Sequence, residues 1–169
     1  MKIIFLDVDG VLNSWQYYKE NEDLICDEPI DPENVACLSE IVKATGAKLV
    51  LSSSWRGGWD KNPAKMEAEG KYIEEALAVH GMKIYDKTGS SDVSFQDARC
   101  REIKAWLRKH PLQVESFVIL DDGDFLWEAH KLTSHLVLTD FEDRGLCKKH
   151  IEPAIKILNH TKRKLFAYL

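Results

Sequence analysis

The sequence predicts one doubly wound α/β domain, in which a parallel sheet is covered by helices on both faces. Short runs rich in Val, Ile and Leu alternate with longer stretches of helical periodicity. These runs are apolar almost throughout, which is typical of strands in a sheet that is buried on both sides. Because the 169 residues contain no repeat, low-complexity stretch or linker, residues 1–169 are expected to form a single domain.

The first strand, the first long helix and the second strand have clear boundaries. Residues 2–6 (KIIFL) predict a buried strand that ends at acidic residues. Asp31 and Pro32 predict the start of a helix, because Asp is favoured at the N-cap and Pro at the first helical position. Gly46 predicts the end of this helix, and residues 47–51 are expected to form the second strand.

The same alternation continues through the rest of the chain. A helical region is expected from Asn62 to Gly81, followed by a weaker strand at residues 82–85. A further helix is expected at residues 97–109, where apolar residues recur at helical spacing. The remaining elements are strands at residues 117–120 and 135–138 and a helix at residues 147–159.

Three segments have no regular pattern. Residues 10–30 and 54–70 are expected to form loops or a minimal cap over a site. Residues 161–169 form a basic and apolar tail to which no element is assigned.

The composition argues against several classes of protein. With 23 Lys and Arg against 28 Asp and Glu, the net charge of −5 disfavours a protein that coats nucleic acid or an anionic membrane. No apolar run approaches the roughly 18 residues of a membrane helix, and the first residues are too acidic for a signal peptide. The cysteines form no CxxC pair, so they are expected to be small buried residues of a reduced, cytoplasmic protein. They are Cys26, Cys37, Cys100 and Cys147.

Acidic and hydroxyl side chains follow three of the expected strands, at the edge where a doubly wound sheet binds its ligand. Asp7 and Asp9 follow the first strand, Ser52–Ser54 follow the second, and Asp121–Asp124 follow the fourth. Carboxylates this close together repel one another and cannot all stay ionised without a cation. Their hard oxygen atoms favour Mg²⁺ over Zn²⁺ as that cation.

These groups are the components of phosphoryl transfer. A metal ion and cationic side chains neutralise the phosphate, while a carboxylate can attack phosphorus and form an acyl phosphate. Gly10 permits a turn after the first acids, so that backbone N–H groups can face an anion. Ser53 and Arg56 lie in and directly after the serine turn, which makes them, with Gly10, candidate substrate-binding residues. Trp55 is expected to pack in the interior, with stacking on a base or sugar as the alternative.

Three strand-terminal motifs show a resemblance to a known family. Residues 7–13 (DVDGVLN) match a DxDGT/V opening, residues 49–52 (LVLS) form a hydrophobic strand ending in Ser, and residues 118–122 (VILDD) form a strand ending in an acidic pair. In this order they resemble the first, second and fourth motifs of the haloacid dehalogenase (HAD) superfamily of aspartate-nucleophile phosphatases. The run SSSWR at residues 52–56 is similar to a small, minimally capped subgroup that includes domains associated with RNA repair.

The resemblance implies a Rossmann-like fold and a role for each matched residue. Asp7 would be the nucleophile and a Mg²⁺ ligand. Asp9 would protonate the leaving oxygen and then activate water, and its backbone carbonyl would also bind the metal. Ser52 would hydrogen-bond the transferring phosphoryl group. Asp122 would be the third protein group on Mg²⁺ with Asp121 in support, although the sequence leaves open which of the two binds the ion directly.

The third motif departs from the family pattern, which usually places a Lys near the helix before the fourth strand. Arg99 is the preferred equivalent, a substitution that keeps the positive charge and changes its geometry. Lys104 is the alternative, but it lies inside the expected helix and is typical of a solvated face.

The leading prediction is a Mg²⁺-dependent phosphatase that acts through an aspartyl phosphate on a small phosphomonoester, a nucleotide or a nucleic-acid end. The first alternative is a non-catalytic domain that binds phosphate or has a regulatory role. The second is a receiver domain phosphorylated on Asp, although the order of the motifs disfavours it. No membrane or protein partner is indicated.

Overall fold

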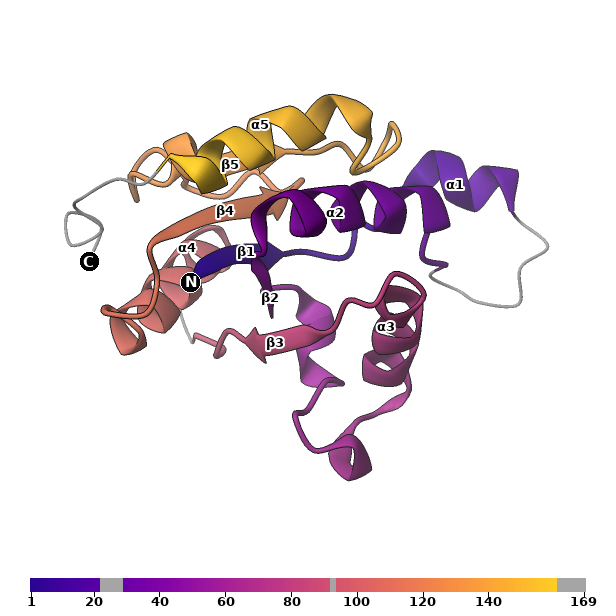
Figure 1. Cartoon of the computed structure of the whole chain (residues 1–169), viewed down its shortest axis with the longest axis horizontal. Helices are drawn as coiled ribbons and strands as arrows, with labels where there is room; N and C mark the ends of the chain where they lie inside the picture. The colour runs from indigo at the N-terminus through magenta and orange to yellow at the C-terminus, as the bar shows by residue number, and fades with distance from the viewer. Residues whose placement is uncertain (22–28, 92–93, 161–169) are drawn as a thin grey trace.

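The computed structural model describes residues 1–21, 29–91 and 94–160. Its centre is a five-stranded sheet with the order β3-β2-β1-β4-β5, in which every pair of neighbouring strands is parallel (Figure 1). This architecture confirms the doubly wound α/β fold. The strands are β1 (Lys2–Leu6), β2 (Lys48–Leu51), β3 (Ile84–Lys87), β4 (Ser116–Asp121) and β5 (Leu136–Leu138).

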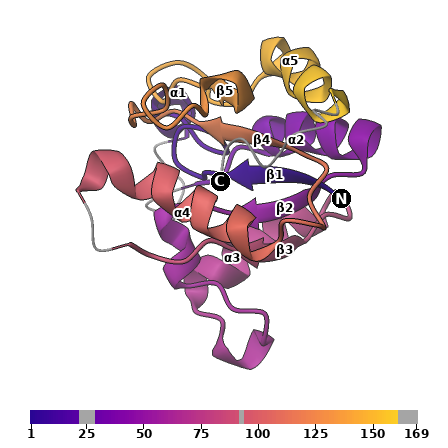
Figure 2. The same cartoon turned by 90° about the vertical axis from the view of Figure 1, so that its left-hand side faces the viewer.

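Helices cover both faces of the sheet. The α-helices are α1 (Trp15–Glu20), α2 (Pro32–Thr45), α3 (Ala68–Ala78), α4 (Phe95–Lys109) and α5 (Lys148–Asn159). Helices α2 and α5 lie side by side over one face, and α4 lies on the other, as Figures 1 and 2 show. The 3₁₀ helices are η1 (Ser54–Gly57), η2 (Pro63–Lys65) and η3 (Thr133–His135).

The central strand β1 contributes to two apolar cores, because successive side chains of a strand point to opposite faces. Ile4 and Leu6 pack in the core formed with α2, α3 and α5. Ile3 and Phe5 pack in the core formed with α4. All four side chains are fully buried, which fixes β1 between its neighbours.

Helix α2 begins and ends at the predicted residues. The Asp31 side chain accepts a hydrogen bond from the Glu33 backbone N–H at 2.8 Å, and Pro32 occupies the first helical position. Gly46 ends the helix with φ of 67°, in the left-handed region that glycine adopts without a steric cost.

The predicted helical region 62–81 is wrong in its first part. Only Pro63–Lys65 form a 3₁₀ turn there, and Met66 is extended. The Glu67 N–H donates to the carbonyl oxygen of Gly58 at 2.8 Å, which ties this segment to η1 before α3 begins at Ala68. The third strand also begins two residues later than predicted, since the Met82 N–H still bonds to the Leu77 carbonyl at the end of α3.

Other predictions have mixed outcomes. The irregular segment 10–30 contains α1, whose N-cap Ser14 accepts a hydrogen bond from the Tyr17 N–H at 3.2 Å. Cys37 and Cys100 are free and buried, but Cys147 is only partly buried. Cys26 and the tail at residues 161–169 lie outside the described residues. No helix in the described part of the chain is long and apolar enough to cross a membrane.

Candidate active site

The residue after each of four strands is held in the sheet by one more backbone hydrogen bond. The Asp7 N–H donates to Leu120, and the Ser52 N–H donates to Leu6, at 3.0 and 2.9 Å. The Thr88 and Thr139 N–H groups make equivalent bonds to the neighbouring strands, both at 3.0 Å. These side chains therefore start from fixed backbone positions along one edge of the sheet.

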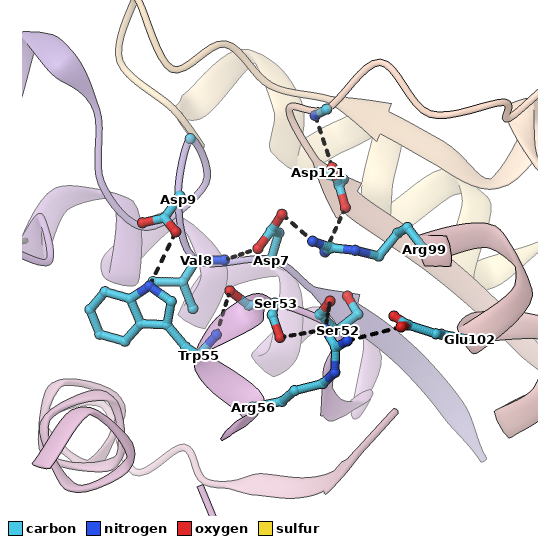
Figure 3. A network of polar contacts seen from close by, with 12 residues as sticks. Asp7, Val8, Asp9, Ser52, Ser53, Trp55, Arg56, Arg99, Glu102 and Asp121 are labelled. Atoms are coloured by element: carbon cyan, nitrogen blue, oxygen red, sulfur yellow. Dashed lines mark hydrogen bonds and ion pairs between the residues drawn. The ribbon is translucent and has the colours of Figure 1, made fainter. Parts of the chain in front are cut away.

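Three carboxylates meet at this edge. Asp7, Asp121 and Asp122 each offer an oxygen atom, and these atoms all lie within 4.8 Å of one another. Arg99 from α4 lies beside them, with Nη1 3.0 Å from Asp7 Oδ2 and 2.9 Å from Asp121 Oδ2 (Figure 3). The other oxygens of these two acids accept backbone N–H groups, that of Val8 for Asp7 and that of Gly123 for Asp121, both at 2.8 Å.

Burial and mutual repulsion disfavour the charged forms of these acids. Burial, followed by the proximity of Asp7, raises the pKa of Asp122 to about 6. Burial also raises the pKa of Asp121 above its usual range; Asp7 acts in the same direction and Arg99 opposes it. One arginine therefore does not compensate the cluster completely.

The donor set of this cluster fits a hard divalent cation. Carboxylate oxygens are the ligands that Mg²⁺ prefers, and a cation would relieve the repulsion among the three acids. Gly10 contributes by its lack of a side chain, because a Cβ atom there would lie 2.2 Å from Asp122 Cγ. Its φ of +69° also favours glycine. The backbone turn after Asp9 is thus packed directly against Asp122.

The Asp9 carboxylate makes two hydrogen bonds at a short distance from the cluster. Asn13 Nδ2 donates to Oδ1 at 2.9 Å. Trp55 Nε1 donates to Oδ2 at 3.1 Å, as Figure 3 shows. Asn13 Oδ1 in turn accepts the Gly10 N–H at 2.9 Å. Both oxygens of Asp9 are therefore oriented by side-chain donors from two different segments.

The serine turn after β2 contains a buried hydroxyl that has no partner among the described residues. Ser52 is fully buried, and its Oγ makes no hydrogen bond with any described residue. Ser53 is also fully buried, and its Oγ accepts the Trp55 N–H at 3.3 Å. A buried hydroxyl without a partner costs stability, so Ser52 is a candidate for binding a ligand at this edge.

Arg56 lies within the protein rather than in the acid cluster. Its Nη1 donates to the Ser53 carbonyl oxygen at 2.8 Å and to that of Ser52 at 3.3 Å. Its Nη2 forms an ion pair with Glu102 of α4 at 2.9 Å (Figure 3). These contacts hold the serine turn against α4.

Of the two cations considered for the third motif, Arg99 reaches the acids, whereas Lys104 lies partly exposed farther along α4.

The contacts of two site residues, Asn13 and Glu102, were not predicted from the sequence. The burial of Trp55 was predicted, but its hydrogen bond to Asp9 was not. Asn13 is four residues after Asp9 in a glycine-containing turn, which is a local signal for a contact. Glu102 is one helical turn after Arg99, on the same face of α4. Trp55 is buried as predicted, but only the folded chain shows that its N–H lies next to Asp9.

Comparison with known proteins identifies the class of this fold and site. The parallel sheet with acids at its carboxyl edge is that of a hydrolase of the HAD superfamily. More narrowly, residues 3–151 match the family described as the HAD domain in Swiss Army Knife RNA repair proteins, and the chain belongs to this family. The comparisons with curated proteins and with solved structures gave no match. Membership of the subgroup with an SSSWR run stays a prediction.

Proposed function

We propose that this chain is a Mg²⁺-dependent phosphomonoesterase that removes the terminal phosphate of a nucleic acid through an aspartyl phosphate at Asp7. The observation that supports this most strongly is the cluster of Asp7, Asp121 and Asp122 beside Arg99. A nucleophile, a set of metal ligands and a cation are thus within reach of one phosphate group.

Asp7, Asp121 and Asp122 are the residues that would hold the metal, with the backbone carbonyl of Asp9 as a further ligand. When bound, Mg²⁺ would neutralise charge on the phosphate during transfer. The guanidinium of Arg99, on α4, would also stabilise the negative charge of the phosphate. The Ser52 hydroxyl, which has no partner in the part of the chain that the structure describes, would donate a hydrogen bond to a phosphoryl oxygen.

The reaction takes two steps in which Asp9 exchanges a proton. In the first, an Asp7 oxygen bonds to phosphorus while the bond to the leaving oxygen breaks, and the Asp9 carboxyl protonates that oxygen. In the second, the Asp9 carboxylate takes a proton from water as the water oxygen attacks phosphorus. The Asp7 carboxylate then leaves, inorganic phosphate is released, and the protons balance.

Two observations favour a nucleic-acid end over a small metabolite. The family description refers to RNA repair proteins. In addition, residues 7–31 between β1 and α2 contain one helix of six residues, α1, in their described part, and this segment is too short for a separate cap domain. A site without a large cap can accept the end of a polymer.

The proposal is tested with p-nitrophenyl phosphate and with oligonucleotides that carry a 5′- or 3′-phosphate, in Mg²⁺ or EDTA. We expect Mg²⁺-dependent release of phosphate, and we expect Asp7→Asn to abolish it while the thermal unfolding transition is kept. Asp143→Asn, at an exposed position, is the matched control and should be fully active. Normal activity of Asp7→Asn would refute the assigned nucleophile. A complete lack of turnover by the wild type would instead support a non-catalytic phosphate-binding domain.

A further inference from the structure

A hollow of about 720 Å³ lies between α4 and the segment that starts at β3. One wall is formed by residues 86–91, and the other by residues 101–110 of α4 and its C-cap. Figure 2 shows α4 and β3 on the side of the molecule that faces the viewer. We call this hollow the α4 groove. It includes Thr88 at the carboxyl edge of the sheet, and extends along α4 away from the candidate active site.

The acidic side chains in the described part of the α4 groove are already paired. Asp86 accepts a hydrogen bond from Trp106 Nε1 at 2.8 Å, and it lies 3.0 Å from Lys61 Nζ. Glu102 pairs with Arg56 at 2.9 Å and accepts the Ser91 N–H at 3.1 Å. The negative charges of this groove are therefore compensated by groups of the protein itself.

The positive charges of the groove are arranged along α4. Arg101, Lys104 and Arg108 are spaced three and four residues apart, so they lie on one side of the helix. Among the described residues Lys104 has no acidic partner, while Arg101 is 4.0 Å from Asp97. Partial burial and the nearby Arg108 lower the pKa of Lys104, as expected for a cation without a compensating anion. This basic stripe stands out in a chain whose net charge is −5.

The length of the stripe fits a phosphodiester backbone. Arg108 lies seven positions after Arg101, which is about 10 Å along a helix with a rise of about 1.5 Å per residue. The phosphates of a duplex strand advance about 3.4 Å each along the duplex axis, and those of an extended single strand lie farther apart, so the stripe spans about two phosphates of a single strand. Arg99, whose guanidinium contacts Asp7, lies two residues before Arg101 on the sheet-facing side of α4, so a strand on the stripe would have to pass the N-terminal turns of this helix to reach Asp7.

A hydroxyl and an aromatic ring of the same groove favour a single strand. Thr88 is 2% exposed, and its Oγ1 makes no hydrogen bond with any described residue. A sugar or phosphate oxygen bound at the end of the groove nearest the sheet edge would supply the partner that this buried hydroxyl lacks among the described residues. At the other end the partly exposed ring of His110 stacks on the buried Trp106, with the ring centroids 3.9 Å apart, so the imidazole of His110 is the aromatic surface on which an unpaired base would stack.

We propose that the α4 groove binds a single strand of nucleic acid and leads its phosphorylated end to Asp7. The placement of the phosphorylated end at Asp7 rests on the proposed function. Binding of a strand in the α4 groove does not, and it can be tested separately. About two phosphates of the strand would contact Arg101, Lys104 and Arg108, and the Thr88 hydroxyl would contact the strand near the site.

The test uses a fluorescent 12-nucleotide oligoribonucleotide without a terminal phosphate and the double variant Lys104→Ala/Arg108→Ala. Fluorescence anisotropy gives the affinity at several salt concentrations. The slope of log K against log salt is negative, and each lost phosphate contact reduces its magnitude by about 0.7 for a single strand, so we expect the magnitude to fall by about 1.4 in the double variant. Affinity at low salt should fall about tenfold or more. Lys43→Ala/Lys156→Ala removes two exposed cations from α2 and α5 on the other face, and should bind as the wild type does.

Hydrolysis of p-nitrophenyl phosphate separates this proposal from the proposed function. We expect equal turnover in the wild type and the Lys104→Ala/Arg108→Ala variant, because a small substrate does not reach the groove. An inactive wild type that still binds RNA through these residues would overturn the proposed function and support the groove. An unchanged affinity and salt slope in the variant would overturn the proposal that the α4 groove binds the strand. Binding of poly-glutamate by the wild type as tightly as the oligoribonucleotide would also overturn it.

Discussion

Arg99 places a single nitrogen atom, Nη1, between the carboxylates of Asp7 and Asp121, 3.0 Å from one and 2.9 Å from the other. The side chains of all three residues are almost inaccessible to solvent, so water screens these charges little. Arg99 thus joins the end of β1 to the end of β4 from a third element, α4. The position of the proposed nucleophile depends on this contact.

Loss of Arg99 should destabilise the protein in a pH-dependent manner. In Arg99→Met, Asp7 and Asp121 remain close together in a buried site without their cation. We expect a loss of about 3 kcal/mol at pH 8, the cost of breaking a buried ion pair. The loss should be smaller at pH 5, because Asp121, whose pKa burial already raises, can then be protonated. Urea unfolding in EDTA at the two pH values measures this difference, and equal losses would contradict it.

Loss of the Trp55 N–H should impair the proton transfer assigned to Asp9. Trp55→Phe keeps an aromatic ring in place and removes the donor to Asp9 Oδ2. We expect kcat/KM to fall about tenfold for an alkyl phosphate, whose leaving group needs a proton. The decrease should be much smaller for p-nitrophenyl phosphate, which has a stable leaving group.

Trp59→Phe is the matched control for this variant. Trp59 Nε1 donates to Glu74 at 2.7 Å, so the substitution also removes an indole hydrogen bond, but one that does not involve Asp9. It should affect both substrates equally. If Trp55→Phe also slows both substrates by the same factor, Trp55 has only a structural role.

Removal of Asp122 should stabilise the metal-free protein and abolish the response to Mg²⁺. Asp122→Asn relieves the repulsion among the three acids. Burial and Asp7 raise the pKa of Asp122 to about 6, because the charged carboxylate is unfavourable in the folded protein. In EDTA we expect a gain of about 1 kcal/mol, or about 2–4 °C in Tm for a domain of this size. Mg²⁺ should raise the Tm of the wild type and of Asp124→Asn, an exposed neighbour, but not that of Asp122→Asn. A full Mg²⁺ shift in Asp122→Asn would remove this residue from the metal site.

His150 should make the stability of α5 depend on pH. Its Nδ1 accepts the Cys147 N–H at 3.0 Å, which requires an unprotonated nitrogen, and burial lowers its pKa below the ordinary 6.5. The unfolded chain therefore binds a proton more readily, so this contribution is complete above pH 6.5 and is lost as the pH falls below it. From pH 7 to 5 the wild type should lose about 1 kcal/mol more than His150→Gln, the size of one helix cap. Parallel pH profiles in urea unfolding would contradict this assignment.

The positions of the strands and the edge at which acids gather follow from patterns that are short in sequence. The run KIIFL ends at Asp7 and the run FVIL at Asp121, and the carboxyl ends of parallel strands share one edge of a sheet. Asp31, Pro32 and Gly46 likewise define α2, because capping depends on neighbouring residues alone. These signals are local, and they are readable without the fold.

The sequence alone determined the α/β class, most element positions and which acids follow which strands. The tertiary structure decided where Asn13, Trp55, Arg56 and Glu102 act. Trp55 and Asp9 are 46 residues apart, as are Arg56 and Glu102, and both contacts depend on how η1 and α4 are rotated against the sheet. The late start of β3 has the same origin, since Met82 bonds back to the end of α3. Periodicity predicts the buried face of an element, but the packing of the whole chain sets which distant side chain lies opposite it.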